Sequence, residues 1–357
     1  MTDCDLLILG SGYFAEVMLN DIAATAKKPV KVIIGGRNLP RMKWLVTAAN
    51  ARAAMFGTHA RFESAEFDMA STQTIADGLS RFAPKVVVQS ASLQSPWKVD
   101  GRDSKWAALV NDAGFGFTLA LQAMLPTRTA RALKESGSKA IFVNTCYPDV
   151  VNQVIKAQGL PITCGVGNIA IFSSIAKSVF DPQGLSSVKV LGHHNHLVDW
   201  RKPAADRTQA PVRVWVDDVE QQGILERFRD VQLPFRDLNV ISGGSAVPVL
   251  LALAGTADCA SHVPGPAGRP GGYPVKVSAG KVELDLPRGL GESDAVAWNL
   301  HFEQADGASV IDRKVVYSSR AREAIAQYDS GIADGFHVED LSEAYARVSA
   351  LRERLGG

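Results

Sequence analysis

The chain has 357 residues, 46% of them apolar and 21% charged, and a formal net charge of +1. This length exceeds one ordinary domain, so we expect two domains. The composition is typical of a soluble globular enzyme, and the near-zero charge gives no reason to expect nucleic acid or an anionic membrane as a partner.

The four cysteines are scattered and form no C-x-x-C pair. This usage indicates reduced thiols in a cytoplasmic protein rather than a disulfide framework. Asp3 and Asp5 stand where a signal peptide carries positive charge, so we expect no signal peptide. The most apolar run, residues 246–255, is about half as long as a membrane span, and Pro248 interrupts it, so we predict a buried helix.

The first informative segment begins at Asp5 and reads DLLILGSGYFA, an apolar run that ends in the pattern G-x-G-x-x-A. A helical pattern follows, and then a second apolar run at 30–34. In this strand–turn–helix–strand context, Gly10 permits a tight turn, Gly12 leaves room for a pyrophosphate, and Ala15 lets the helix pack closely. The free N–H groups of the helix start attract the phosphates. We therefore predict a dinucleotide-binding unit.

The end of the second strand indicates which dinucleotide binds. NAD-binding proteins place Asp or Glu there, whereas residues 35–38 of this chain read GGRN. These four residues include no carboxylate that would repel a 2′-phosphate. Arg37 could bind that phosphate bidentately, with Arg41 as a second cation. The pattern favours NADP(H) over NAD(H). The alternative is that Arg37 is a solvated loop charge.

The remaining first half alternates helices and strands. We predict helices over 41–55, 72–82 and 105–136, the last interrupted at 114–116 (GFG) and at Pro126, and strands over 60–63, 85–89 and 140–144. The polar stretch 90–103 follows the strand at 85–89, where open α/β sheets bind ligands. Lys98 and Arg102 in this stretch would close over an anionic substrate as a lid; the alternative is solvated charges.

The second half mixes strands and helices differently. We predict helices over 150–158, 169–180, 222–230, 246–254 and 341–355, strands near 161–166, 187–192 and 211–216, and a hairpin of 273–277 with 281–286. The segment 262–272 is a loop rich in proline and glycine. The predicted fold is therefore α/β, with an N-terminal Rossmann parallel sheet (1–146) and a C-terminal α+β catalytic domain (147–357).

Three segments resemble a known superfamily. Residues 142–149 (FVNTCYPD) are similar to the asparagine–proline segment of lactate and malate dehydrogenases and of the NAD-dependent glycosidases that share their fold. Residues 165–170 (GVGNIA) resemble the glycine-rich segment of both families. Residues 192–200 (GHHNHLVDW) resemble the histidine segment of both. The order and spacing agree over about residues 6–200.

The resemblance implies roles for single residues. Asn144 would lie beside the nicotinamide and touch the substrate oxygen, and His194 aligns with the dehydrogenase histidine that exchanges a proton. Ala170 and Ser173 stand where the dehydrogenases carry Asp and Arg, so this segment predicts neither a histidine–aspartate pair nor a carboxylate clamp. Gly167 replaces the cysteine metal ligand of the glycosidases, and we predict no metal.

The histidine cluster leaves alternatives open from the residues alone. If a strand runs through it, His194 and His196 point to one face and His193 to the other. One histidine in a ligand cleft is a natural general acid near neutral pH, whereas two with Asp199 could bind a divalent metal. A third alternative is packed histidines without a role. We interpret Cys146 as a packed thiol rather than a nucleophile.

Together these patterns predict a cytoplasmic NADP(H)-dependent oxidoreductase that transfers hydride between nicotinamide and a small carbonyl or imine substrate. The alternatives are a metal- and NAD-dependent glycosidase-like enzyme and a non-catalytic NADPH-binding regulatory protein. We expect a homo-oligomer, a dimer, without nucleic-acid or membrane partners. The expected catalytic residues are His194, His196, Asn144 and Arg102. The expected cofactor-binding residues are Gly10, Gly12, Tyr13, Phe14, Arg37, Asn38, Ser90 and Asn144.

Overall fold

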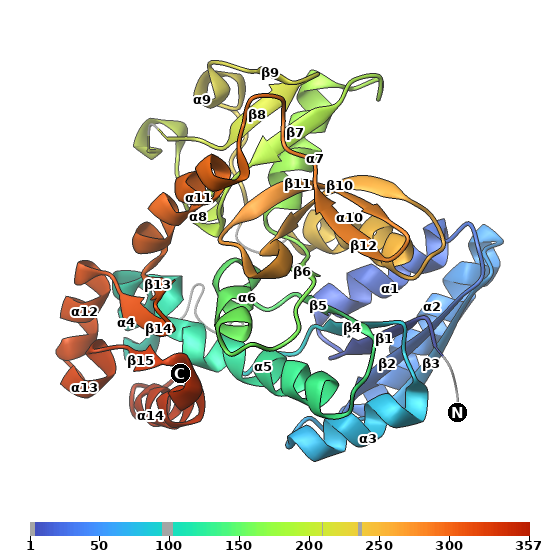
Figure 1. Cartoon of the computed structure of the whole chain (residues 1–357), viewed down its shortest axis with the longest axis horizontal. Helices are drawn as coiled ribbons and strands as arrows, with labels where there is room; N and C mark the ends of the chain where they lie inside the picture. Colours follow the sequence, from blue (N-terminus) through green and yellow to red (C-terminus); the bar gives the residue numbers. More distant parts are fainter. Residues whose placement is uncertain (1–3, 95–102, 209, 235–237) are drawn as a thin grey trace.

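The fold is organised around one six-stranded parallel sheet (Figure 1). We describe a computed structural model that covers residues 4–94, 103–208, 210–234 and 238–357, so Lys98 and Arg102 lie outside it. The strand order β3-β2-β1-β4-β5-β6 is the Rossmann order. The strands are β1 (Leu6–Leu9), β2 (Val30–Gly36), β3 (Ala60–Glu66), β4 (Val86–Gln89), β5 (Ile141–Asn144) and β6 (Cys164–Gly165).

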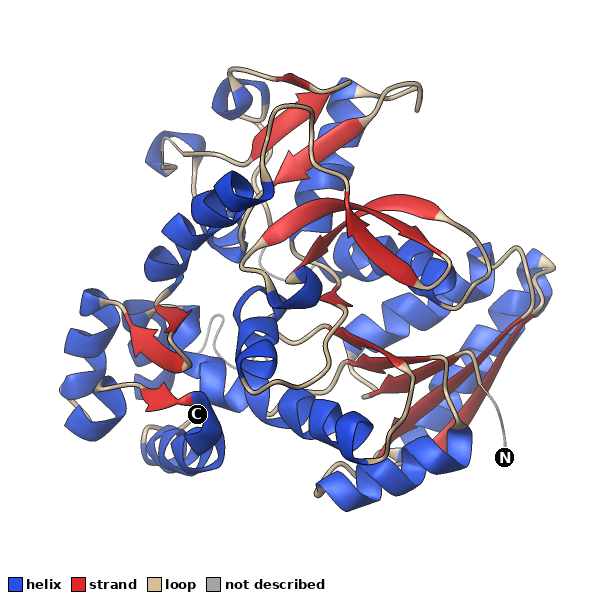
Figure 2. Ribbon diagram, in the orientation of Figure 1, coloured by secondary structure: helices blue, strands red, loops and turns tan. Residues whose placement is uncertain are grey.

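Short apolar strands form this sheet because helices bury both of its faces. Every residue of β1 is buried, and successive side chains contribute to opposite cores. Leu6 and Ile8 pack with α1 (Tyr13–Thr25), α2 (Leu39–Phe56) and α10 (Leu238–Leu253). Leu7 and Leu9 pack in the core beneath α3 (Thr72–Phe82), α5 (Leu119–Glu135) and α6 (Pro148–Ala157). Figure 2 shows the sheet between these helical layers.

The second half adds two antiparallel sheets above the Rossmann sheet (Figure 2). One contains β7 (Val188–Leu191), β8 (Arg213–Val216) and β9 (Val219–Glu220); the other contains β10 (Cys259–Pro264), β11 (Gly272–Ser278) and β12 (Lys281–Leu284). The predicted hairpin is confirmed as β11–β12, and the predicted buried helix as α10. Residues 262–264, which were predicted to belong to the loop 262–272, form the end of strand β10. The helices of this region are α7 (Ile169–Phe180), α8 (His194–Trp200) and α9 (Ile224–Arg227).

The C-terminal region forms a small unit that packs beside α4 (Lys105–Ala113) and α5. It comprises α11 (Glu292–Asp306), β13 (Ala308–Ile311), β14 (Lys314–Tyr317), α12 (Ser319–Ala326), α13 (Ser330–Ala333), β15 (Phe336–His337) and α14 (Leu341–Arg354). The predicted fold class is confirmed, and so is the terminal helix. Strand β6 enters the Rossmann sheet from beyond residue 146, so both predicted regions contribute to that sheet. No single helix in the described ranges has the length and apolar character to cross a membrane. Within those ranges, one pair of helices, 105–113 and 115–135, is long and apolar enough when taken together, but the two are bent by 117° at their junction.

The interruption predicted at 114–116 is confirmed, because a 3₁₀ turn at 115–118 separates α4 from α5, whereas Pro126 lies inside α5 and does not end it. Two glycines explain the break. A Cβ added at Gly114 would lie 2.7 Å from the carbonyl oxygen of Asp306, and one at Gly116 would lie 2.5 Å from the amide nitrogen of Ala308. Gly114 also has a φ of 92°, which side chains rarely adopt. The turn therefore touches the backbone where α11 ends and β13 begins.

We predict that Gly116→Ala lowers the free energy of unfolding by about 1–3 kcal/mol, because the added methyl group forces two backbone segments apart. Urea denaturation measures the change. Gly12→Ala is the control, since a Cβ there meets no atom within 4 Å and the φ is negative. Equal stability of the two variants would contradict the close packing.

Candidate functional site

A cavity of about 930 Å³ lies where the sheet strands reach their carboxyl ends. Gly10, Gly12, Tyr13, Phe14 and Ser90 line it from the Rossmann half. The starts of α7, α8 and α10 and the end of α11 line it from the second half. The cavity therefore joins the glycine turn to the histidine segment.

The glycine turn leaves space and free N–H groups for an anionic ligand. Gly10 has a φ of 120°, and a Cβ there would lie 2.7 Å from the amide nitrogen of Ala91, so the turn packs against the loop after β4. A Cβ at Gly12 would meet nothing within 4 Å, and no side chain caps the start of α1 there. The side-chain hydroxyl of Ser90 is buried and has no hydrogen-bond partner among the described residues. These features suit a pyrophosphate at a helix N-terminus.

The residues after β2 occupy different positions. Arg37 and Asn38 are exposed and do not line the cavity, and Asn38 caps α2 by accepting a 3.1 Å hydrogen bond from the Arg41 amide. Arg41 donates from Nε to the Ser11 carbonyl oxygen (2.7 Å) and from Nη2 to Glu16 Oε2 (2.8 Å). Arg41 therefore stabilises the glycine turn, and Arg37 is an exposed cation directly after β2.

The histidine cluster lies at a helix start, so a strand through these residues is wrong. Strand β7 ends at Leu191, and Gly192 forms an isolated bridge with Gly272. Helix α8 begins at His194, with the His193 side chain accepting a hydrogen bond from the backbone as the N-cap. The helical turn separates the three imidazoles, and among the described residues only His194 of the three lines the cavity.

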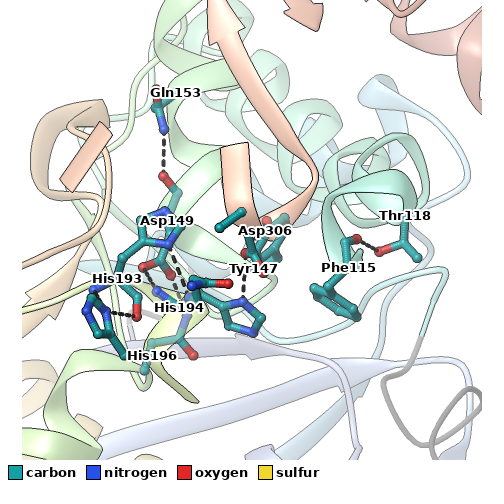
Figure 3. A network of polar contacts seen from close by, with 12 residues as sticks. Phe115, Thr118, Tyr147, Asp149, Gln153, His193, His194, His196 and Asp306 are labelled. Carbon is teal, nitrogen blue, oxygen red and sulfur yellow. Dashed lines mark hydrogen bonds and ion pairs between the residues drawn. The ribbon is translucent and has the colours of Figure 1, made fainter. Parts of the chain in front are cut away.

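His194 forms an ion pair with a carboxylate from the far end of the chain (Figure 3). Its Nδ1 lies 2.8 Å from Asp306 Oδ2, and the Tyr147 hydroxyl donates to the same oxygen at 2.6 Å. The rings of Phe115 and Tyr147 flank the imidazole, with centroids 5.3 Å and 5.1 Å away. The Nδ1 contact leaves Nε2, on the opposite side of the ring, for a ligand.

The protonation of this pair follows from competing effects. Burial alone would lower the pKa of His194, but the negative charge and hydrogen bond of Asp306, aided by Asp149, raise that pKa above its usual value. Burial alone would raise the pKa of Asp306, but His194 and the Tyr147 hydroxyl hold it below its usual value. The imidazolium–carboxylate form therefore persists to a higher pH than for a free histidine.

A second carboxylate fixes the backbone of His194. The amide N–H of His194 donates to Asp149 Oδ1 at 3.1 Å, and the Asn168 side-chain amide donates to the other Asp149 oxygen. Gln153 donates to the backbone oxygen of Asp149 at 2.8 Å (Figure 3). It also donates to the Glu303 carboxyl group. Helix α6 therefore anchors the start of α8.

The imidazoles of His196 and His193 are buried and pack inside the protein. The His196 ring stacks on Trp298, with centroids 5.4 Å apart and planes 9° apart, and it lies 4.3 Å from the Phe302 ring. Burial lowers the pKa of His196 to about 4 and also lowers the pKa of His193. Both rings are neutral near pH 7. Within the described ranges, no group of three or more His, Cys, Asp or Glu side chains is placed to hold a metal ion.

Asn144, which was expected to lie beside the nicotinamide, is not among the residues that line the cavity. It is fully buried; its Nδ2 donates to the Cys146 carbonyl oxygen (3.1 Å) and to Asn152 Oδ1 (2.9 Å), and its Oδ1 accepts from the Cys146 amide (2.9 Å). It therefore shapes the turn after β5. Burial raises the pKa of the Cys146 thiol to about 12, which fits the packed thiol that we expected. Arg102 lies outside the described residues.

Sequence reasoning missed Asp306, Tyr147 and Asp149. The expectation that His194 lacks an aspartate partner is wrong, because Asp306 supplies it from 112 residues further along the chain. Asp306 ends α11 and precedes Gly307, which looks like an ordinary helix end in the sequence. Tyr147 has a φ of 44° directly before Pro148, and nothing in the local pattern indicates its contact with Asp306.

Three solved structures show the same fold. No family model and no curated protein matches the chain. Malate dehydrogenase from Cryptosporidium parvum is 12% identical, with a TM-score of 0.52, covering 84% of this chain and 96% of that one. Lactate dehydrogenase from the same organism is 17% identical, with a TM-score of 0.52, covering 84% and 97%. Malate dehydrogenase from Aeropyrum pernix is 16% identical, with a TM-score of 0.50, covering 82% and 93%. The predicted resemblance to these dehydrogenases is confirmed for the fold.

We predict that Asp306→Asn lowers the pKa of His194 from its raised value, because burial and the positive charge of Arg201 are then opposed only by the charge of Asp149. NMR titration of the His194 ring measures this pKa. Asp199→Asn is the control, because Asp199 is a carboxylate of the same cavity that does not contact His194. An unchanged His194 titration in Asp306→Asn would contradict the pairing.

Proposed function

We propose that the protein is an NADP(H)-dependent oxidoreductase that transfers hydride between nicotinamide C4 and the carbonyl or imine carbon of its substrate. One observation carries the proposal: His194, paired with Asp306, lies on the same cavity as the glycine turn of the Rossmann sheet. The fold shared with lactate and malate dehydrogenases supports it. His194 is the proposed proton donor and acceptor.

The Rossmann half fits a dinucleotide by its own geometry. The open space over Gly12 and the uncapped start of α1 would hold the pyrophosphate, and the buried Ser90 hydroxyl is an unused polar group beside them. Tyr13 and Phe14 line the same wall of the cavity. Gly10 and Gly12 would thus bring the backbone within reach of the phosphates.

The chain's own residues supply positioning and the proton. When bound, the nicotinamide would supply or accept the hydride. His194 holds a proton at Nε2, from which it can pass to the carbonyl oxygen or imine nitrogen as the hydride arrives at the carbon. Asp306 accepts a hydrogen bond from Nδ1 and stabilises the imidazolium, while Tyr147 fixes the carboxylate. In the oxidative direction, neutral His194 takes the proton back.

We predict that His194→Asn reduces turnover by about 10²- to 10⁴-fold, the usual contribution of a positioned proton donor, and leaves NADPH affinity near normal. Reduction requires the imidazolium, so kcat/KM of the wild type should fall as pH rises through the raised pKa of His194. Steady-state kinetics over pH 5–9 would show this fall, and the variant should lack it.

His196→Asn is the matched control, because it removes an imidazole from the same helix that faces aromatic rings instead of the cavity. Turnover per folded protein should stay near the wild-type value. A larger loss of turnover in His196→Asn than in His194→Asn would show that His196, and not His194, donates the proton. Near-normal turnover in both variants would remove the cluster from catalysis.

The preference for NADP(H) rests on Arg37. Strand β2 ends in Gly36, and the next residue is the exposed Arg37, at the position where a ribose diol meets a carboxylate in NAD-binding sites. A guanidinium there can bind a 2′-phosphate through two charge-assisted hydrogen bonds. Glu66, paired with Gly36 in the sheet register, is a carboxylate at the same edge that would favour an unphosphorylated ribose. We propose that Arg37 decides the preference.

We predict that Arg37→Ala weakens NADPH binding by about ten- to a hundredfold and NADH binding much less, because only NADPH carries the 2′-phosphate. Fluorescence titration of each reduced cofactor measures both affinities. Arg61→Ala is the control, since Arg61 is an exposed arginine near the opposite end of the neighbouring strand β3. Equal losses for the two cofactors in Arg37→Ala would overturn the NADP(H) preference.

A further inference from the structure

The C-terminal unit builds part of the cavity wall and contributes an arginine to it. Arg320 lines the cavity from α12, beside Ala305 and Asp306 at the end of α11. Its Nη2 lies 3.4 Å from the carbonyl oxygen of Ala305, the residue before Asp306. The carboxylate of Asp306 in turn contacts His194. The end of α11 therefore brings a guanidinium to the same part of the cavity as the proposed proton donor.

The turn at 114–115 connects the guanidinium with the imidazole. A Cβ added at Gly114 would lie 3.2 Å from Arg320 Nη2, and the ring of the next residue, Phe115, lies 5.3 Å from the His194 ring with planes 30° apart. Because Nδ1 of His194 contacts Asp306, Nε2 lies on the opposite side of the imidazole. A ligand that reaches from Nε2 to Arg320 therefore extends beyond its reacting group, and the Phe115 ring, which lines the cavity, offers it an apolar surface.

The described residues do not neutralise the charge of Arg320. Its contact with Ala305 is long and goes to a neutral carbonyl, and no carboxylate of the described residues forms an ion pair with it. The described cavity wall has two carboxylates: Asp306 pairs with His194, and Asp199 pairs with Lys202. An anionic ligand group would complement the free charge of the guanidinium.

The local structure of α12 does not explain an arginine at this position. Arg320 is the second residue of the helix, which the Ser318 hydroxyl caps by accepting a hydrogen bond from the Ala321 amide. A positive charge in the first turn opposes the helix dipole and destabilises the helix slightly. A ligand in the cavity gives the guanidinium a use that the helix does not.

We propose that the substrate is elongated, with the reacting carbonyl or imine at His194, an apolar middle against Phe115, and an oxyanion bound by Arg320. A planar guanidinium binds a carboxylate or a phosphate bidentately, and both share this oxyanion chemistry. The inference rests on the proposed function and names the substrate class of the same site. The C-terminal unit then selects substrates by a charge remote from the reacting carbon.

Three aromatic aldehydes with the same reacting group test the inference: 4-formylbenzoate, its methyl ester and 4-formylphenyl phosphate. With NADPH, the wild type should reduce at least one anionic aldehyde with a kcat/KM about ten- to a hundredfold above that of the ester, which lacks the charge-assisted hydrogen bonds. Arg320→Gln should bring that ratio to about one. The larger kcat/KM among the two anionic aldehydes shows whether the site prefers a carboxylate or a phosphate.

Arg322→Gln is the matched control, because it removes the same charge from the same helix. Arg322 is exposed and is not among the described residues that line the cavity. The ratio should persist in Arg322→Gln. An equal loss in both variants would replace the Arg320 contact by a general charge effect and overturn the inference. A wild-type ratio near one, or a ratio that survives Arg320→Gln, would also overturn it.

Binding without turnover separates this inference from the proposed function. Isothermal titration of the three aldehydes into the protein with NADP⁺ should show tighter binding of an anionic aldehyde than of the ester, and Arg320→Gln should remove the difference. If the wild type reduces none of the aldehydes but shows this binding pattern, the proposed hydride transfer fails and the oxyanion site stands. If it reduces them without the pattern, the oxyanion site fails. If it does neither, both fail.

Discussion

The ion pair between His194 and Asp306 places a strong constraint on this fold. Asp306 is 2% exposed, and a buried carboxylate without a partner is costly, so the pair requires three distant segments to meet: the end of α11, the start of α8 and the turn after β5. Gly114 and Gly116, which flank the start of the 3₁₀ turn, pack directly on the backbone at Asp306 and allow α5 and α11 to come close together. Tyr147 shares the same carboxylate oxygen. The proposed chemistry and the packing of the C-terminal region therefore depend on one contact.

The Rossmann half could be predicted from the sequence because its signals are local. The β1 run LLIL, the glycines that follow it and the helix of α1 are continuous in the chain, and each indicates its own structure. Strand β10 and the strands β13, β14 and β15 lacked such signals, although β10 pairs with the next strand β11 and β13 with the next strand β14. Strand β10 mixes polar with apolar residues and ends in a proline, and β13, β14 and β15 have only two to four residues, too few to show a period. The partnership of His194 and Asp306 spans 112 residues, and no local pattern indicates a contact of that kind.

The histidine segment shows why alternation alone misleads at the end of a strand. Residues 188–191 form β7, but the bridge of Gly192 to Gly272 ends the strand, and the chain turns into α8. In a helix, residues two apart point in different directions, so His194 reaches the cavity while His196 packs against Trp298. Arg41 is a similar case: its charge was visible in the sequence, but its contacts with Ser11 and Glu16 are tertiary.

In the proposed function, a nicotinamide held by the glycine turn presents its C4 atom to the His194–Asp306 pair. A crystal structure of the protein with NADP⁺ tests it most directly. We expect the pyrophosphate over Gly12 at the start of α1, and the nicotinamide ring inside the cavity with C4 facing the side on which His194 Nε2 lies. A dinucleotide bound elsewhere, or a nicotinamide whose C4 is turned away from His194, would contradict it.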